Sequence, residues 1–124
     1  MMQTYKFPES EKVFLDMLNQ IFEIEKKLEK IQETNTIARN LTNIKNLFET
    51  RLYEKSQSGL TVHNPLGEAY DQTRLDCEAS IAGESTENLV ITEVIKPIIR
   101  LKQGGLNQIV QKAVVVVQSK NSIS

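Results

Sequence analysis

The sequence predicts an α+β fold in which amphipathic helices precede a small, mainly antiparallel β-domain. Between residues 9 and 55 the chain has no glycine and no proline, and its apolar residues recur at intervals of three and four. After residue 58, short runs rich in β-branched residues alternate with turn sequences. Elements segregated in this way imply an α+β architecture, and short loops between strands imply mainly antiparallel pairing.

The 124 residues divide into an N-terminal tail (1–8), a helical dimerisation region (9–57), a β-domain (58–119) and a C-terminal tail (120–124). The net charge of −1 gives the chain no general attraction to nucleic acid or to an anionic membrane. We find no signal peptide and no membrane-spanning run. A single cysteine excludes an intramolecular disulfide, and together these features predict a cytoplasmic protein.

Two apolar stripes follow one another in the helical region. The first consists of Val13, Phe14, Met17, Leu18, Ile21, Phe22, Ile24, Leu28 and Ile31, and the second of Ile37, Leu41, Ile44, Leu47, Phe48 and Leu52. Their phase slips between residues 33 and 36. This slip indicates either one long helix with a stammer or a helical hairpin, with Asn35 near a C-terminus and Thr36 as the next N-cap. We favour the hairpin because residues 34–36 are poor helix formers.

The stripes are broader than a two-stranded coiled-coil seam, and two helices alone have too few partners to bury them. Taken singly, an apolar residue of such a stripe most often packs in the core of the helical region. A second copy of the chain is the simplest source of the missing cover, so we predict a homodimer. The predicted dimerisation residues are Phe14, Leu18, Ile21, Leu28, Ile31, Leu41, Ile44 and Phe48.

The β-domain begins with a short strand at Leu60–His63, followed by a turn at residues 65–67. The next segment alternates, which predicts a strand with one face on a core and the other in water. The apolar face consists of Leu75, Cys77, Ala79 and Ile81, and the polar face of Arg74, Asp76, Glu78 and Ser80.

Further strands are predicted at Leu89–Ile95, Ile98–Leu101 and Ile109–Gln118. Pro97 marks an edge, a bulge or a bend, because it cannot donate to a central ladder. Gly104-Gly105 predicts a hairpin. The unbroken run at residues 114–117 predicts a central strand covered on both faces.

We predict no catalytic site, no cofactor and no metal site. His63 is the only histidine and has no nucleophile beside it in the sequence. Cys77 is expected to act as a small buried apolar residue. Asp76 and Glu78 share one strand face, but two acids on a solvated face usually serve solubility rather than catalysis.

The β-domain resembles that of GrpE-type nucleotide exchange factors, which act on DnaK-type chaperones. The matching features are Pro65, Gly67, Glu68, Tyr70 and Asp71 at the turn, then Glu78-Ala79, then Val90 to Ile95, and finally Ala113, Val115 and Val117 in an alternating last strand. The preceding helices also fit, since members of that family pair their helices in a dimer.

The resemblance implies a protein that is not an enzyme and that promotes ADP release from a DnaK-type chaperone by protein–protein contact. The contact surface that it implies includes Gly67, Glu68, Tyr70, Asp71, Arg74 and Glu78. One alternative is a dimeric assembly module whose β-domain binds an unrelated partner. Another is a small enzyme whose site is completed in an oligomer, with Asp76 or Glu78 as its acid.

Overall fold

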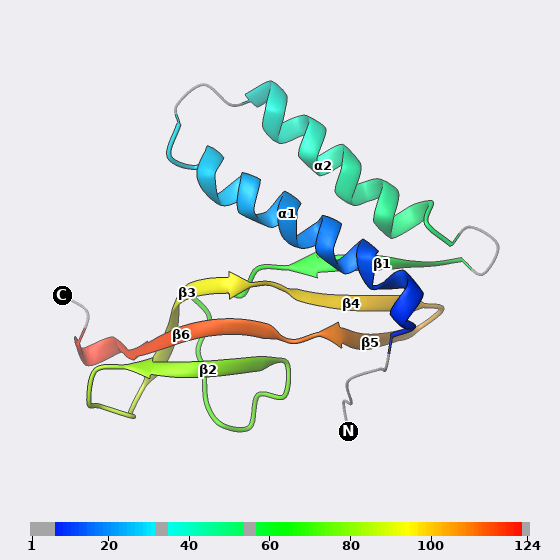
Figure 1. The fold of residues 1–124 in the computed structure, drawn as a ribbon. Coiled ribbons are helices and arrows are strands. Elements are labelled where there is room, and N and C mark those ends of the chain that lie inside the picture. Colours follow the sequence, from blue (N-terminus) through cyan, green and yellow to red (C-terminus); the bar gives the residue numbers. More distant parts are fainter. Residues whose placement is uncertain (1–6, 32–34, 54–56, 123–124) are drawn as a thin grey trace.

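The computed structural model describes residues 7–31, 35–53 and 57–122. A short 3-10 turn (Glu9–Glu11) precedes helices α1 (Lys12–Leu28) and α2 (Asn35–Thr50). The strands are β1 (Ser58–His63), β2 (Cys77–Ala82), β3 (Leu89–Lys96), β4 (Ile98–Gln103), β5 (Leu106–Gln111) and β6 (Ala113–Ser119), and a second 3-10 turn (Lys120–Ser122) follows. Two helices followed by six strands confirm the predicted α+β class (Figure 1).

The helices lie side by side, which confirms the two-helix alternative (Figure 1). Lys45 Nζ of α2 lies 2.7 Å from Glu25 Oε2 of α1, and the rings of Phe14 and Phe48 meet edge to face at 6.2 Å. The predicted cap is wrong, because α2 already begins at Asn35 and the next residue lies within its first turn. Residue 34 lies outside the described residues. No helix in the described part of the chain has the length and apolar character needed to cross a bilayer.

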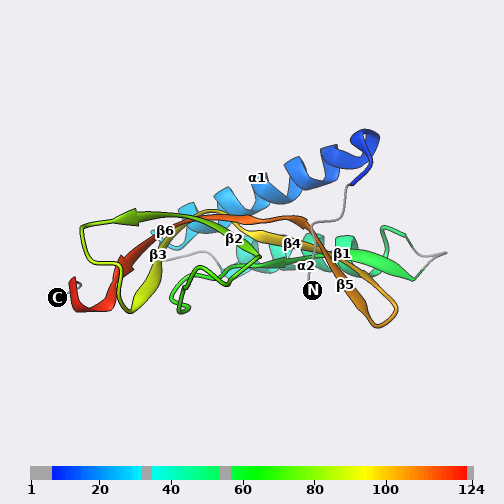
Figure 2. The same cartoon turned by 90° about the horizontal axis from the view of Figure 1, so that it is seen from below.

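The six strands form two three-stranded sheets, in the orders β1-β4-β5 and β2-β6-β3. Pairing is antiparallel as predicted, except that β2 and β6 run parallel. Pro97 lies between β3 and β4, where the chain bends from one sheet into the other, and Gly104 has the positive φ of a hairpin turn. In Figure 2 the strands form a thin layer, and α1 runs along one side of it.

The β1-β4-β5 sheet and the hairpin share one core, in which the chain itself covers the inner faces of both helices. Its buried residues are Phe7, Leu15, Leu18, Ile21, Leu41, Phe48, Leu60, Ile99, Leu101 and Val110. Leu18, Ile21, Leu41 and Phe48, predicted to form the dimer, are therefore unavailable to a second copy, which corrects those four assignments. The reason is that the sheet supplies the apolar partner surface that two helices alone lack.

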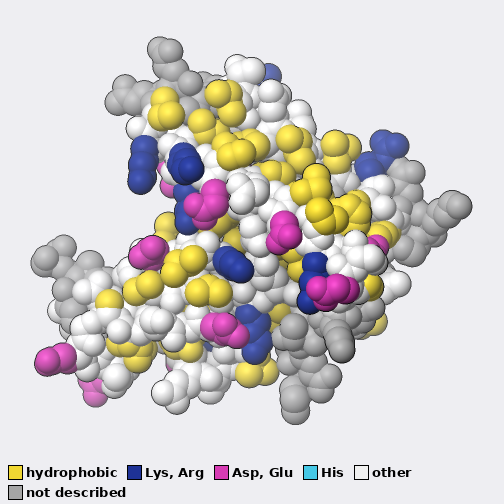
Figure 3. Space-filling model, viewed as in Figure 1, with side chains coloured by type: hydrophobic (Ala, Val, Ile, Leu, Met, Phe, Trp, Pro, Cys, Tyr) yellow, Lys and Arg dark blue, Asp and Glu magenta, His cyan; other side chains and the backbone are white. Residues whose placement is uncertain are grey.

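The hairpin keeps a second apolar surface, which we call the outer apolar stripe. It consists of Val13, Met17, Ile24, Ile31, Ile37, Ile44 and Leu47, each between 38% and 58% exposed. Two predicted dimerisation residues, Ile31 and Ile44, belong to it, whereas Phe14 and Leu28 are half-buried beside the core. Hydrophobic side chains can be seen gathered over the hairpin in Figure 3.

The β2-β6-β3 sheet has its own core, centred on β6. Val115 and Val117 are buried, while the alternate residues of β6 are half-buried. The strand is central, which agrees with the prediction. Only one of its faces is fully covered, however, whereas the prediction was that both would be. The apolar face predicted for β2 also needs correction. Cys77 is buried, but Leu75 and Ile81 are 48% and 43% exposed. The strand begins only at Cys77 and lies at the edge of its sheet, so less of it is covered.

Candidate functional site

The segment between β1 and β2, residues 64–76, carries most of the predicted contact residues, and we call it the turn segment. Pro65 is buried at its start, and Glu68 N donates to Pro65 O over 3.1 Å to close a tight turn. Gly67 has φ of +85°, a conformation that glycine adopts without a steric cost. The local sequence thus determines this reversal of the chain.

Backbone hydrogen bonds attach the turn segment to the outer edge of β3. Gly67 N donates to Ile91 O, Ile91 N donates to Glu68 O, and Tyr70 N donates to Leu89 O, each over 2.9 Å. These three bonds, with the isolated bridge between Ala69 and Val90, hold residues 67–70 against the sheet. The backbone of this part of the turn segment is therefore fixed by the chain itself.

Five charged or titratable side chains form a closed ionic network at the base of the turn segment. Its members are His63 of β1, Glu68, Arg74 and Asp76 of the turn segment, and Arg100 of β4. Arg74 binds Asp76 through two bonds, Nε–Oδ1 at 2.9 Å and Nη2–Oδ2 at 3.1 Å, and it reaches Glu68 Oε1 at 3.0 Å. Arg100 Nη2 donates to the same oxygen, Asp76 Oδ2, at 3.2 Å.

His63 closes the network between Glu68 and Arg100. Its Nε2 lies 2.6 Å from Glu68 Oε2, and its Nδ1 lies 3.3 Å from Arg100 Nη1. A guanidinium group can only donate, so Nδ1 must accept, and the neutral tautomer with its proton on Nε2 satisfies both contacts. The network then holds two carboxylates and two guanidinium groups, so its charges balance.

The electrostatics follow from these contacts. The hydrogen bonds from Arg74 hold the pKa of Asp76 below its usual value, although burial opposes the shift. Burial also acts to raise the pKa of Glu68, but the hydrogen bonds from His63 and Arg74 together outweigh it and lower that pKa. The pKa of Arg74 is raised, chiefly by its bonds to Asp76. The carboxylates of Asp76 and Glu68 and the guanidinium of Arg74 therefore stay ionised at neutral pH.

Five of the six predicted contact residues lie in the turn segment, namely Gly67, Glu68, Tyr70, Asp71 and Arg74. Asp71 is exposed and accepts hydrogen bonds from the Thr73 hydroxyl and, at 2.8 Å, from Thr73 N, which fix the next bend. Both bonds, and chiefly that from the hydroxyl, lower the pKa of the Asp71 carboxyl. Glu78 stands apart on β2, where it is exposed.

Three members of the ionic network were missed as contact residues by sequence reasoning: His63, Asp76 and Arg100. His63 and Arg100 are far apart in the chain and meet because β1 and β4 pair antiparallel, with Thr61 opposite Arg100 and His63 opposite Ile98. Only the register of that pairing could have revealed them. Asp76 was predicted to be solvated, but its carboxylate instead accepts hydrogen bonds from the guanidinium groups of Arg74 and Arg100.

A hollow of about 660 Å³ lies beside the turn segment. It is lined by Ala69, Tyr70, Asp71, Gln72, Ala79, Ile81, Thr86, Asn88 and Leu89. Tyr70, Ala79, Ile81 and Leu89 give it an apolar floor, and Asp71 is the only charged group in this lining. The hollow can take an apolar side chain from a partner.

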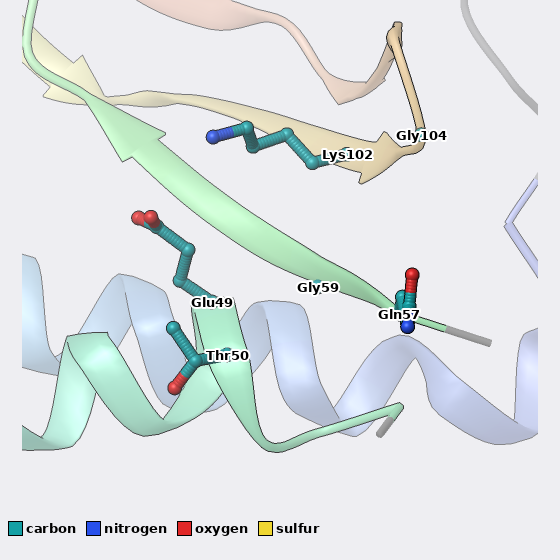
Figure 4. A pocket seen from close by; sticks show the side chains of 6 residues that line it. All are labelled: Glu49, Thr50, Gln57, Gly59, Lys102 and Gly104. Atoms are coloured by element: carbon teal, nitrogen blue, oxygen red, sulfur yellow. The ribbon is translucent and has the colours of Figure 1, made fainter. Parts of the chain in front are cut away.

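A second pocket of about 370 Å³ lies where α2 passes β1 (Figure 4). It is lined by Glu49, Thr50, Gln57, Gly59, Lys102 and Gly104. Glu49 and Lys102 lie on either side of β1 in this view. No histidine or cysteine is among these described lining residues. Nor do the described residues of the chain contain a group of three or more His, Cys, Asp or Glu side chains placed to hold a metal ion.

Comparisons of the chain with protein-family models, with curated proteins and with solved structures found no match.

Proposed function

We propose that the chain is a GrpE-like exchange factor, which promotes ADP release from a DnaK-type chaperone through protein–protein contact. The observation that supports this most is the preorganised turn segment. Gly67, Glu68 and Tyr70, which carry part of the resemblance, lie on a backbone bound to β3, and Glu68 also joins the ionic network. Beside them, Leu66 is 52% exposed, and Asp71 and Glu78 also reach solvent.

The proposed mechanism is differential binding. A partner protein shifts a conformational equilibrium only by the difference between its affinities for the two states. A turn segment that fits the open form of the nucleotide-binding lobes would favour that form, and ADP would then leave faster. A held conformation strengthens this effect, because little conformational entropy is lost when the surface docks. No covalent chemistry is required, and we place the activity in the cytoplasm.

We further propose that two copies associate through the outer apolar stripe. Seven half-exposed aliphatic residues form this stripe. An exposed apolar surface that extends over two helices is typical of the middle of an interface. Two hairpins that meet face to face would give a four-helix arrangement with one β-domain at each side.

The test is the rate at which a DnaK-type chaperone releases fluorescently labelled ADP, measured by stopped flow with and without the chain. We expect the chain to accelerate release. Glu78→Lys should weaken the effect about two- to fivefold, the range for an exposed charge at an interface rim. Asp71→Asn should weaken it similarly, because the amide keeps the local turn but removes the charge.

Glu87→Lys is the matched control, since Glu87 is an exposed acid in the loop between β2 and β3 and lines none of the surfaces described above. It should leave the rate unchanged. A wild-type chain that does not change ADP release would refute the exchange function. Such a result would favour the second candidate, an assembly module that presents the same turn segment to a different protein.

A further inference from the structure

Strand β2 forms an open edge of the β2-β6-β3 sheet. Its inner edge pairs with β6, and the strand order leaves its outer edge without a neighbouring strand among the described residues. The opposite edge of the same sheet is different. There the turn segment covers β3 through the three backbone bonds described above and a bridge between Ala69 and Val90. One edge is thus covered by the chain, and the other is open.

The register identifies which backbone groups are available on this open edge. Cys77 lies opposite Ala113, and Ala113 N donates to Asp76 O over 2.9 Å. In a parallel pair, successive residues direct their N–H and C=O groups to alternate edges. Glu78 and Ser80 therefore direct these groups toward β6. Cys77, Ala79 and Ile81 direct theirs outward.

The hollow beside the turn segment extends from Leu89 of β3 to β2. Ala79 and Ile81, which direct their backbone groups outward, line its β2 end. An added strand would therefore place every second side chain on this face, next to the half-exposed Ile81. Its other side chains would lie on the opposite face, where Glu78 is exposed.

The charges around this edge define the chemistry of the occupant. Asp71 lies at the hollow and Glu78 on the opposite face, while no Lys or Arg lines the described hollow. Edge strands that natural proteins protect from pairing commonly carry Lys or Pro, and β2, with the sequence CEASIA, has neither. We propose that the outer edge of β2 binds an extended segment of a partner protein in which apolar and basic residues alternate.

This strand addition would combine main-chain hydrogen bonds, which give affinity, with side-chain pockets, which give specificity. The apolar residues of the segment would lie against Ile81, and its basic residues would lie near Glu78. Glu78 and Asp71 belong to both surfaces, but the proposal does not depend on exchange activity, because its main contacts are the outward backbone groups of β2 and its test measures peptide binding.

The test uses the full chain and a fluorescein-labelled decapeptide of alternating valine and lysine, with binding followed by fluorescence anisotropy. We expect saturable binding. Ile81→Lys should weaken it about tenfold or more, as expected for the loss of a central contact. Ile95→Lys is the matched control, because Ile95 of β3 is 44% exposed and Ile81 is 43% exposed. This control should bind as the wild type does.

A second variant, Ala79→Pro, removes one outward N–H without touching the bonds to β6, and it should also weaken binding. Amide hydrogen exchange followed by NMR should show new protection at Ala79 and Ile81 on peptide addition, with Glu78 and Ser80 unchanged. Equal affinity for a valine–glutamate peptide, protection confined to other strands, or no saturable binding would overturn the proposal. Pairing of two copies through β2, abolished by Ile81→Lys, would also overturn it, since the occupant would then be the chain itself.

Discussion

Gly59 is the position where a single methyl group should disturb the structure most. It lies in β1 where the C-terminal half of α2 passes, and a Cβ added there would be 1.8 Å from Glu49 O and 2.8 Å from Phe48 O. Both are backbone atoms, so no side-chain rotation relieves the overlap. The shorter distance falls about 1.6 Å below the 3.4 Å at which ordinary contact begins. Gly59→Ala therefore requires α2 to move away from β1.

That movement would separate residues that share one core, because Phe48 of α2 and Leu60 of β1 are both buried there. Overpacking of a well-filled core costs about 1–3 kcal/mol and sometimes more, and we expect about 3 kcal/mol here because the clash involves backbone. For a domain of this size such a loss lowers the melting temperature by about 10 °C.

The assay is thermal and urea unfolding followed by circular dichroism. Gly105→Ala is the matched control, since a Cβ at Gly105 meets nothing within 4 Å. This control should change the free energy of unfolding by less than about 0.5 kcal/mol. If Gly59→Ala is as stable as Gly105→Ala, then α2 does not lie against β1 as described.

Four further predictions follow from the ionic network, the outer apolar stripe and the second core. Arg74→Leu should cost about 2 kcal/mol in urea unfolding, because it removes the cation that Glu68 and Asp76 share at a partly exposed site, whereas exposed Arg39→Leu should cost under about 0.5 kcal/mol. The pKa of Asp76 is lowered by folding, so its stabilising effect is complete above its usual value of 3.8 and is lost as pH falls through the folded-state pKa. Unfolding free energy should therefore drop below about pH 4, and less steeply in Asp76→Asn. Light scattering should give a dimer for the wild type and a monomer for Ile44→Glu, and a monomeric wild type would contradict the proposed association. Burial raises the pKa of Cys77 to about 11, so iodoacetamide should modify it slowly until urea unfolds the chain; fast modification of the folded chain would be inconsistent with its burial.

The helices and most strands were predictable because their signals are local. Intervals of three and four depend only on the geometry of one helix, and β-branched runs depend on one strand. The strand predicted at Leu89–Ile95 is observed at Leu89–Lys96, and the hairpin at Gly104 is confirmed. The predicted strand at Ile109–Gln118 is instead two strands divided at Lys112, because its first half pairs with β4 and its second half with β3.

What could not be predicted depends on pairing between distant segments. The parallel pairing of β2 with β6 brings residues 77–82 beside 113–118, and no local pattern encodes it. The ionic network has the same origin, since His63 and Arg100 meet only through the register of β1 with β4. The burial of Leu18 and Ile21 was assigned to a second copy because the sequence alone does not show that a later sheet covers them.

Amide hydrogen exchange of the full chain, alone and with a DnaK-type chaperone, tests most directly whether the turn segment is the surface that contacts this partner. We predict that the chaperone protects residues 64–76 and leaves the exposed loop 83–88 unchanged. Protection confined to α1 and α2 would contradict that role for the turn segment. So would the absence of protection at concentrations of the two proteins at which the chain accelerates ADP release.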